Sequence, residues 1–198
     1  MIMNWNKIAT LLLLMSCLTA VGKGAPPEDR TKVVEHLGST PIYQEELELH
    51  IRNQTAMVAV YFKAKYNANL TGAVWNQDFD GEVPSERLRC QALDACLRAK
   101  ALQVLAHEHR VGKRLPFPNF KKHCQDINRR RKEAREAGKI LYGPVSYDPW
   151  QLYQYELSIL RIQLRAELSD DSSDFDTSET ALNKVIMARL AADVSADD

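Results

Sequence analysis

His107, Glu108 and His109 are the residues whose types come nearest to a metal site. A zinc-binding helix of this kind uses two histidines four positions apart, which places both imidazoles on one face. The two histidines here are two positions apart, so on a helix they point in divergent directions. The spacing therefore argues against a metal site, and we expect neither a metal ion nor another cofactor.

Nucleophilic catalysis has no signature in this sequence. Serines, histidines and thiols are present, but there is no Gly-x-Ser-x-Gly elbow, no glycine-rich phosphate loop and no known Cys/His motif. A triad assembled only in three dimensions would leave no such motif. The sequence favours a protein that is not an enzyme.

The chain has 4 cysteines: Cys17, Cys90, Cys96 and Cys124. Cys90 and Cys96 are six positions apart on one predicted helix, so they lie on different sides of it and too far apart for a standard bridge. Cys124 could pair with either of them. Because free cysteine is among the residue types most often buried, we favour unpaired thiols that face a helical core.

A run of four basic residues extends from Arg129 to Lys132, and such a run can bind phosphate or nucleic acid. Glu133 and Glu136 follow at the spacing of helical ion pairs, which favours a solvated, salt-bridged helix face. The whole chain carries 26 basic and 26 acidic residues. Since these charges cancel, we expect no nucleic-acid partner and no field that would gather the whole chain on an anionic membrane.

Residues 8–21 form an apolar run after a polar stretch that contains Lys7. The run has the length of a signal-peptide core and is short for a membrane-spanning helix. Small residues at Ala20-Val21-Gly22 suit cleavage, whereas Leu14-Met15-Ser16-Cys17 resembles a lipobox that would lead to lipidation of Cys17. We slightly favour cleavage, with a signal peptide at residues 1–22; an uncleaved anchor is a third outcome. We predict an exported protein, either periplasmic or an extracytoplasmic membrane-anchored lipoprotein.

The pattern of apolar residues predicts an all-α protein. A chain of 198 residues, 45% hydrophobic, can bury one principal core. Residues 23–32 read as a proline-containing spacer, and residues 31–42 could form a short strand and turn. Helices are then expected at residues 44–66, from Pro84 to Gly112, from about Phe117 to Gly138, and from the cap signal Asp148-Pro149-Trp150-Gln151 to Leu168.

The C-terminal part is predicted to add one more helix. Residues 169–178 are a polar, acidic linker. Asp176-Thr177-Ser178-Glu179 has the form of a capping box and would open a helix over residues 179–193. This helix carries Leu182, Val185, Ile186 and Leu190, so it needs an apolar surface on which to pack. We expect it to dock on the main domain.

A spaced series of aromatic, glycine and proline residues covers the predicted helices. As a set, the series resembles the N-terminal, peptide-binding domain of the extracytoplasmic chaperones and foldases typified by SurA and PrsA, with a likeness over residues 33–168. The stretch Gly38-x-x-x-Ile42-x-x-x-Glu46 introduces the first helix in this resemblance. Its other members include Tyr61-Phe62, Lys65-Tyr66, Trp75, Gly81-Glu82-Val83-Pro84, Lys100, Asn128-Arg129-Arg130, Tyr142-Gly143-Pro144, Tyr153 and Tyr155.

The resemblance implies an orthogonal or elongated helical cradle that binds unfolded or extended exported polypeptides and assists their folding or assembly. Gly81, Pro84, Asn128, Arg129, Arg130, Gly143 and Pro144 would be structural landmarks at helix ends. The candidate peptide-binding residues are Trp75, Tyr61, Phe62, Tyr142, Trp150, Tyr153 and Tyr155. Among them, Trp75 is expected to be exposed, because it lies in a polar loop at residues 67–80. Aromatic residues at helical spacing are nevertheless core residues more often than binding residues.

Two alternative functions stay open at the level of sequence. One is a dedicated scaffold or assembly subunit for a single exported partner. The other is a prolyl isomerase, because relatives of this type carry a parvulin-type domain after the N-terminal helices. The residues after Leu168 offer no room for such a domain, so we expect that activity to be absent. Unfolded or nascent exported chains are the expected partners, and contact with a membrane is expected only through a signal or lipid anchor. The oligomeric state is left open.

Overall fold

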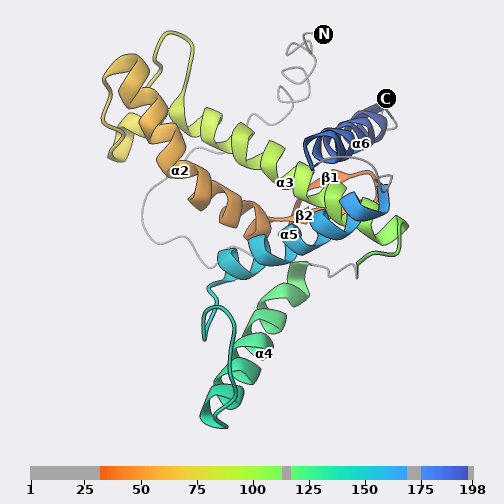
Figure 1. Cartoon of the computed structure of the whole chain (residues 1–198). Coiled ribbons are helices and arrows are strands. Elements are labelled where there is room, and N and C mark those ends of the chain that lie inside the picture. Colours follow the sequence, from red (N-terminus) through yellow and green to blue (C-terminus); the bar gives the residue numbers. More distant parts are fainter. Residues whose placement is uncertain (1–31, 113–116, 169–174, 196–198) are drawn as a thin grey trace.

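The computed structural model describes residues 32–112, 117–168 and 175–195. The predicted signal peptide, Cys17, most of the spacer, and the linker residues 169–174 lie outside the described residues. The elements in chain order are β1 (Val33–Leu37), β2 (Thr40–Tyr43), α2 (Gln44–Tyr66), a short 3-10 helix (Gly72–Asn76), α3 (Pro84–Glu108), α4 (Phe117–Glu136), α5 (Pro149–Leu168) and α6 (Phe175–Ser195). The expected all-α class with a short N-terminal β element is confirmed (Figure 1).

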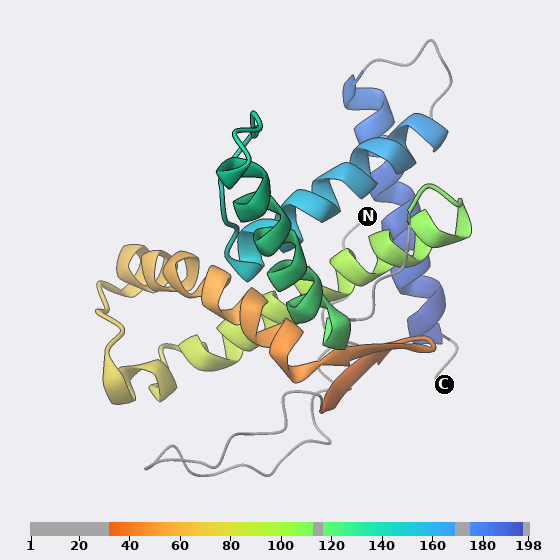
Figure 2. The ribbon, with the colours of Figure 1, turned by 90° about the horizontal axis from the view of Figure 1, so that it is seen from below.

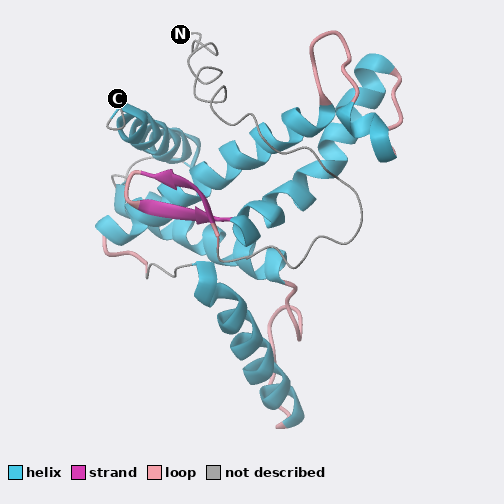
Figure 3. Ribbon diagram, turned by 180° about the vertical axis from the view of Figure 1, so that it is seen from behind, coloured by secondary structure: helices cyan, strands magenta, loops and turns pink. Residues whose placement is uncertain are grey.

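The two strands form an antiparallel hairpin in which Leu37 pairs with Thr40. Gly38 has a φ of 52° and supplies the left-handed backbone of the turn, which a side chain would disfavour. Leu37 and Ile42 are buried, and the hairpin contacts α3 and α6 (Figure 3). The chain then enters α2 directly from β2. Tyr43 makes no side-chain cap there, in line with its place where a serine or threonine is usual.

Helices α2 and α3 lie side by side in opposite directions and form an arm (Figures 1 and 2). The predicted bounds of the first helix are confirmed at Gln44–Tyr66, and Asn67 ends it in a left-handed conformation with φ 53°. Asp80 and Gly81 both have positive φ and close a two-residue turn in which Phe79 and Glu82 exchange backbone hydrogen bonds. An Asp-Gly pair is a preferred sequence for such a turn. Pro84 then begins α3.

The predicted end of α3 at Gly112 is wrong, because the helix ends at Glu108. Arg110 takes the left-handed conformation that a glycine would normally supply, with φ 59°. The N–H of Arg110 donates to the carbonyl of His107, and the N–H of Val111 donates to that of Ala106. This pattern is a Schellman motif, and Val111 packs back on the core as the motif requires.

Helix α4 projects from the rest of the molecule as a second arm (Figures 1 and 3). Only Phe117, Phe120 and Cys124, near its beginning, are buried. Gly138, with φ 71°, follows the end of α4, and after a short loop the chain returns along α4 to α5. The predicted cap of α5 is confirmed: Asp148 Oδ1 accepts from the N–H groups of Trp150 and Gln151 at 2.9 and 3.1 Å.

Helix α6 packs against α3, α5 and β1. It begins at Phe175, so the expected cap at Asp176 is wrong; Asp176 lies inside the first turn. An acidic side chain there interacts favourably with the helix dipole without acting as a cap. Leu182 and Ile186 are buried in one cluster with Leu102, Leu105 and Leu164. Glu108 pairs with Arg189 of α6 at 2.9 Å, so the middle residue of the His-Glu-His sequence contacts another helix.

Candidate polypeptide-binding surface

Two of the seven candidate binding residues are core residues. Phe62 has no exposed surface and packs with Val58 in the α2–α3 arm. Tyr153 is 3% exposed and packs with Phe117 and Phe120 between α5 and the base of α4. Their expected role in peptide binding is therefore wrong, because a client chain cannot reach them in this structure.

The expected exposure of Trp75 is also wrong. The polar loop that contains it folds into the 3-10 helix Gly72–Asn76, and this helix contacts α3. Trp75 is consequently half-buried and packs against the Val58–Phe62 cluster at the end of the arm. A polar loop can turn its one large apolar side chain inward, and the sequence of the loop alone does not reveal this.

Tyr61 belongs to a polar cluster at the end of the α2–α3 arm. Glu82 accepts hydrogen bonds from the Tyr61 hydroxyl and from Lys65 Nζ, each at 2.9 Å. The Arg87 guanidinium lies over the Tyr61 ring at 3.7 Å from its centroid. The bonds from Lys65 and Tyr61 hold the pKa of Glu82 below its ordinary value. The cluster fixes the Asp80-Gly81 turn between the two helices and leaves Tyr61 half-buried.

A buried ion pair joins α2, α3 and α5. Lys100 Nζ lies 2.8 Å from Glu46 Oε2, and the Tyr153 hydroxyl donates to Glu46 Oε1 at 2.9 Å. Glu46 has no exposed surface, and burial raises its pKa while Lys100 opposes the rise. All three residues belong to the set that carries the family resemblance, but their positions in the sequence do not show that they pair. Side chains from three helices that meet in this way determine how the helices cross.

His50 lies beside this ion pair with its ring edge-on to Trp150 and Tyr153. The side chain is 3% exposed, and its Nε2 has no hydrogen-bond partner among the described residues. Burial, with a smaller contribution from the charge of Lys100, lowers the pKa of His50 from 6.5 to about 4. The imidazole is therefore neutral at physiological pH. His50 was not among the predicted site residues, because a lone histidine on a helix gives no signal in the sequence.

The segment that returns along α4 is held by side chains that bind its backbone. Asn128 Nδ2 donates to the Tyr147 carbonyl at 2.9 Å, and the Tyr147 N–H donates to Asn128 Oδ1 at 2.8 Å. Arg131 donates to the carbonyls of Tyr142 and Pro144 at 2.6 and 2.7 Å. Arg131 was not among the predicted landmarks, although it lies one helical turn after Asn128. Gly143, with φ 79°, provides the bend in this segment.

The two arginines predicted as landmarks beside Asn128 do not hold this segment. Arg129 pairs with Asp126 and Glu133 on the surface of α4, and Arg130 is exposed. Lys132 lies 3.9 Å from Glu136. The predicted salt-bridged helix face is confirmed for Arg129 and Lys132, and such exposed pairs contribute little to stability.

One exposed aromatic candidate, Tyr155, lies on α5. Tyr155 is 51% exposed and its ring stacks on that of Tyr147. Ile159 and Ile162 follow at helical spacing and are also exposed. We call Tyr155, Ile159 and Ile162 the α5 stripe. Tyr153 and Leu164, on the opposite side of α5, face the core, and Leu152 near the start of the helix is buried as well. Helix α5 is therefore apolar on two sides, and the described part of the protein covers one of them.

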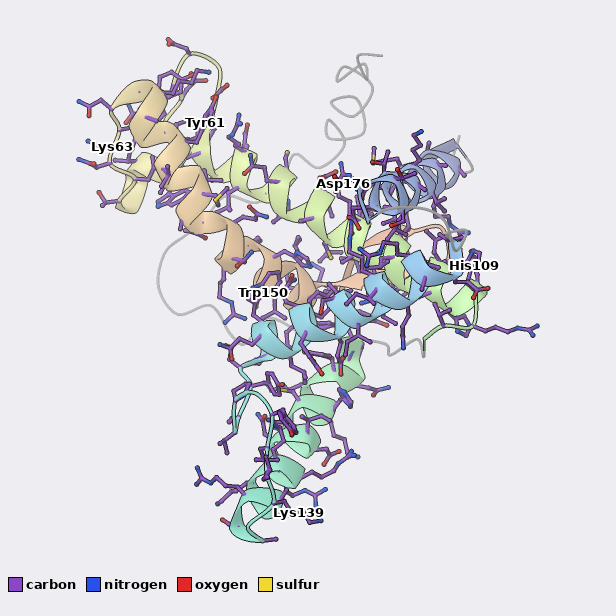
Figure 4. The ribbon with its side chains drawn as sticks, in the orientation of Figure 1. Tyr61, Lys63, His109, Lys139, Trp150 and Asp176 are labelled. Carbon is purple, nitrogen blue, oxygen red and sulfur yellow. The ribbon has the colours of Figure 1, made fainter. Side chains whose placement is uncertain are left out.

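A groove of about 340 Å³ lies between α2 and the beginning of α5. Trp150 and Leu49 form apolar parts of its lining, and Arg52, Asn53 and Asp148 supply polar groups. Figure 4 shows Trp150 where α2 and α5 meet. Tyr142, the last candidate, is 87% exposed and belongs to the end of the α4 arm. Among the seven candidates, the structure thus leaves Tyr142 and Tyr155 exposed and Trp150 at a groove.

The three cysteines in the described part of the chain are free. The preferred interpretation of buried thiols holds for Cys96 and Cys124, whereas Cys90 is exposed. Burial raises the pKa of all three thiols, so they are mainly protonated at neutral pH. The alternative of a bridge from Cys124 to Cys90 or Cys96 is absent in this structure.

Comparison of the chain with family models, curated proteins and solved structures found no match. None of the helices among the described residues is long and apolar enough to cross a membrane.

Proposed function

We propose that this protein is an exported, chaperone-like protein that binds unfolded or extended polypeptides and assists their folding or assembly outside the cytoplasm. The observation that carries the proposal is the α5 stripe, an exposed apolar surface on a helix whose other side is fixed in the core. Unfolded chains expose apolar side chains of many kinds, and a promiscuous binder needs apolar surface more than a precise polar code.

Two further features support this proposal. The resemblance to the peptide-binding domains of extracytoplasmic chaperones rests partly on Glu46, Lys100 and Tyr153, and both Lys100 and Tyr153 contact Glu46. The groove beside Trp150 supplies a second apolar surface with polar groups along it. Polar groups of this kind can pair with the backbone of an extended chain.

Suppression of aggregation tests the proposal directly. The purified protein should slow the aggregation of two unrelated unfolded proteins at near-equimolar ratio. Replacing Ile159 and Ile162 by serine should weaken this effect several-fold, because it removes most of the apolar stripe. Both positions are exposed, so the free energy of unfolding should change by only about 0.5 kcal/mol for each substitution.

Serine at Met57 and Val60 of α2 is the matched control, since both side chains are 68% exposed and apolar. If both variants lose the suppression of aggregation equally, exposed apolar side chains in general account for binding. The α5 stripe is then not the specific binding site. No suppression by the unchanged protein would contradict the chaperone proposal itself.

A dedicated scaffold for one exported partner is the second candidate function. The spacing of the α5 stripe, at i, i+4 and i+7, is the spacing by which one amphipathic helix packs on another. This function predicts that a single protein co-purifies from the exporting cell, that its binding depends on Ile159 and Ile162, and that unrelated unfolded chains do not compete for it.

A further inference from the structure

The end of the α4 arm presents the two most exposed large apolar side chains among the described residues. Ile140 is 83% exposed and Tyr142 is 87% exposed. They lie just after the end of α4, between Gly138 and Gly143, both of which have positive φ. Figure 4 shows Lys139 at the far end of the arm, away from the core. We call residues 139–142 the arm tip.

Side chains of α4 hold the backbone at Tyr142 and in the segment that follows the arm tip. Arg131 binds the carbonyls of Tyr142 and Pro144, and Asn128 binds the backbone of Tyr147 in both directions. The described structure thus fixes the segment through its main chain and directs Ile140 and Tyr142 outward. This arrangement suits side chains that insert into something outside the protein.

The charge of the arm indicates what that partner is. Residues 117–139 contain eight lysines and arginines and three acidic residues, although the whole chain is neutral. Asp126, Glu133 and Glu136 pair with Arg129 and Lys132. The remaining basic residues include Arg130, Arg135 and Lys139, all exposed. The arm is therefore locally cationic, which suits an anionic surface.

Shape separates a membrane from a polypeptide as the partner. An extended polypeptide is held in a groove that surrounds it, whereas the arm tip protrudes (Figures 1 and 3). Protruding apolar side chains, a tyrosine and flanking basic residues fit the interface of an anionic bilayer, where basic residues near the surface strengthen binding. We propose that the arm tip docks this protein on an anionic membrane surface. This inference does not depend on the proposed function of the α5 stripe.

A fluorophore at the arm tip tests the proposal. The full chain would carry Cys17→Ser, Cys90→Ser and Tyr142→Cys, with an environment-sensitive dye on the new thiol. We expect a several-fold rise in emission with a blue shift on vesicles of phosphatidylcholine and phosphatidylglycerol, and little change on phosphatidylcholine alone. A label at one position is needed because residues 8–21 are apolar and could themselves enter a bilayer. The same label at Met57→Cys, exposed on α2, is the matched control and should not respond.

Two charge changes complete the experiment. Arg130→Gln with Arg135→Gln should weaken the response at residue 142 by tenfold or more, because two cationic side chains near the lipid surface are lost. High salt should act in the same direction. The proposal is overturned if the label at 142 stays silent, if it responds equally to neutral vesicles, or if Met57→Cys responds as strongly. A response to unfolded polypeptide without vesicles would also overturn it and assign the arm tip to client binding.

Discussion

Among single residues, Glu46 shows how strongly burial changes the role of a side chain. Its carboxylate lies in the core and is balanced by Lys100 and by the Tyr153 hydroxyl. Breaking such a pair is costly, since it leaves an uncompensated buried charge. The three residues come from three helices, so their contact specifies how the helices cross. The sequence placed all three residues in the family resemblance, but their contact with one another appears only in the tertiary structure.

His50 should make stability depend on pH. Its pKa falls from 6.5 to about 4 on folding, so the unfolded chain binds more protons between these values. The contribution of neutral His50 is complete above pH 6.5 and is lost as the pH falls towards 4, by roughly 3 kcal/mol. Urea unfolding at pH 7 and near pH 4.5 measures this loss. His50→Leu should remove most of it.

The comparison with His50→Leu is necessary because Glu46 acts in the opposite direction. Its raised pKa makes the folded state bind more protons than the unfolded state above about pH 4.5, so its contribution to stability falls as the pH rises. Subtracting the variant from the unchanged protein isolates the histidine. An equal pH dependence in both proteins would show that His50 is not the group that titrates.

At the scale of elements, the end of α3 offers a way to stabilise the protein. Arg110 adopts a left-handed conformation that costs a non-glycine residue roughly 1–2 kcal/mol. Arg110→Gly should raise the free energy of unfolding by up to about 1 kcal/mol, after the greater freedom of glycine in the unfolded chain is taken into account. Chemical denaturation measures the change.

Arg110→Ala is the control for this effect, because alanine keeps the Cβ that disfavours the left-handed conformation. It should show no gain. If alanine stabilises the protein as much as glycine does, the benefit comes from removal of the arginine side chain and not from the backbone.

At the scale of the whole molecule, the C-terminal helix α6 packs on the core of the main domain. Leu182 has no exposed surface and packs with Leu102 and Leu164. Leu182→Ala should lower the free energy of unfolding by about 2–5 kcal/mol, through lost burial and the cavity left behind. Lys184→Ala, at an exposed position of the same helix, should change it by about 0.5 kcal/mol or less.

Urea unfolding followed by far-UV circular dichroism makes this comparison. A single transition that shifts in Leu182→Ala places α6 within the cooperative unit. If Leu182→Ala and Lys184→Ala unfold alike, α6 does not contribute to the core in solution.

The sequence by itself determined the elements. The bounds of α2, the start of α3 at Pro84 and the cap of α5 at Asp148 follow from local spacing, turn residues and capping, which act over a few positions. The predicted end of α3 was wrong because an arginine, Arg110, takes the left-handed conformation after the helix that a glycine usually takes.

Only the tertiary structure decided which side chains are available to a partner. Helix α5 is apolar on two sides, so its periodicity could not say that Tyr153 is buried and Tyr155 exposed. Trp75 turned inward for a similar reason, since a neighbouring cluster received it. The pairing of Glu46 with Lys100 likewise depends on how the helices are arranged in space, as does the projection of the cationic α4 segment away from the core. Burial is a property of the whole assembly of helices, and local sequence does not contain it.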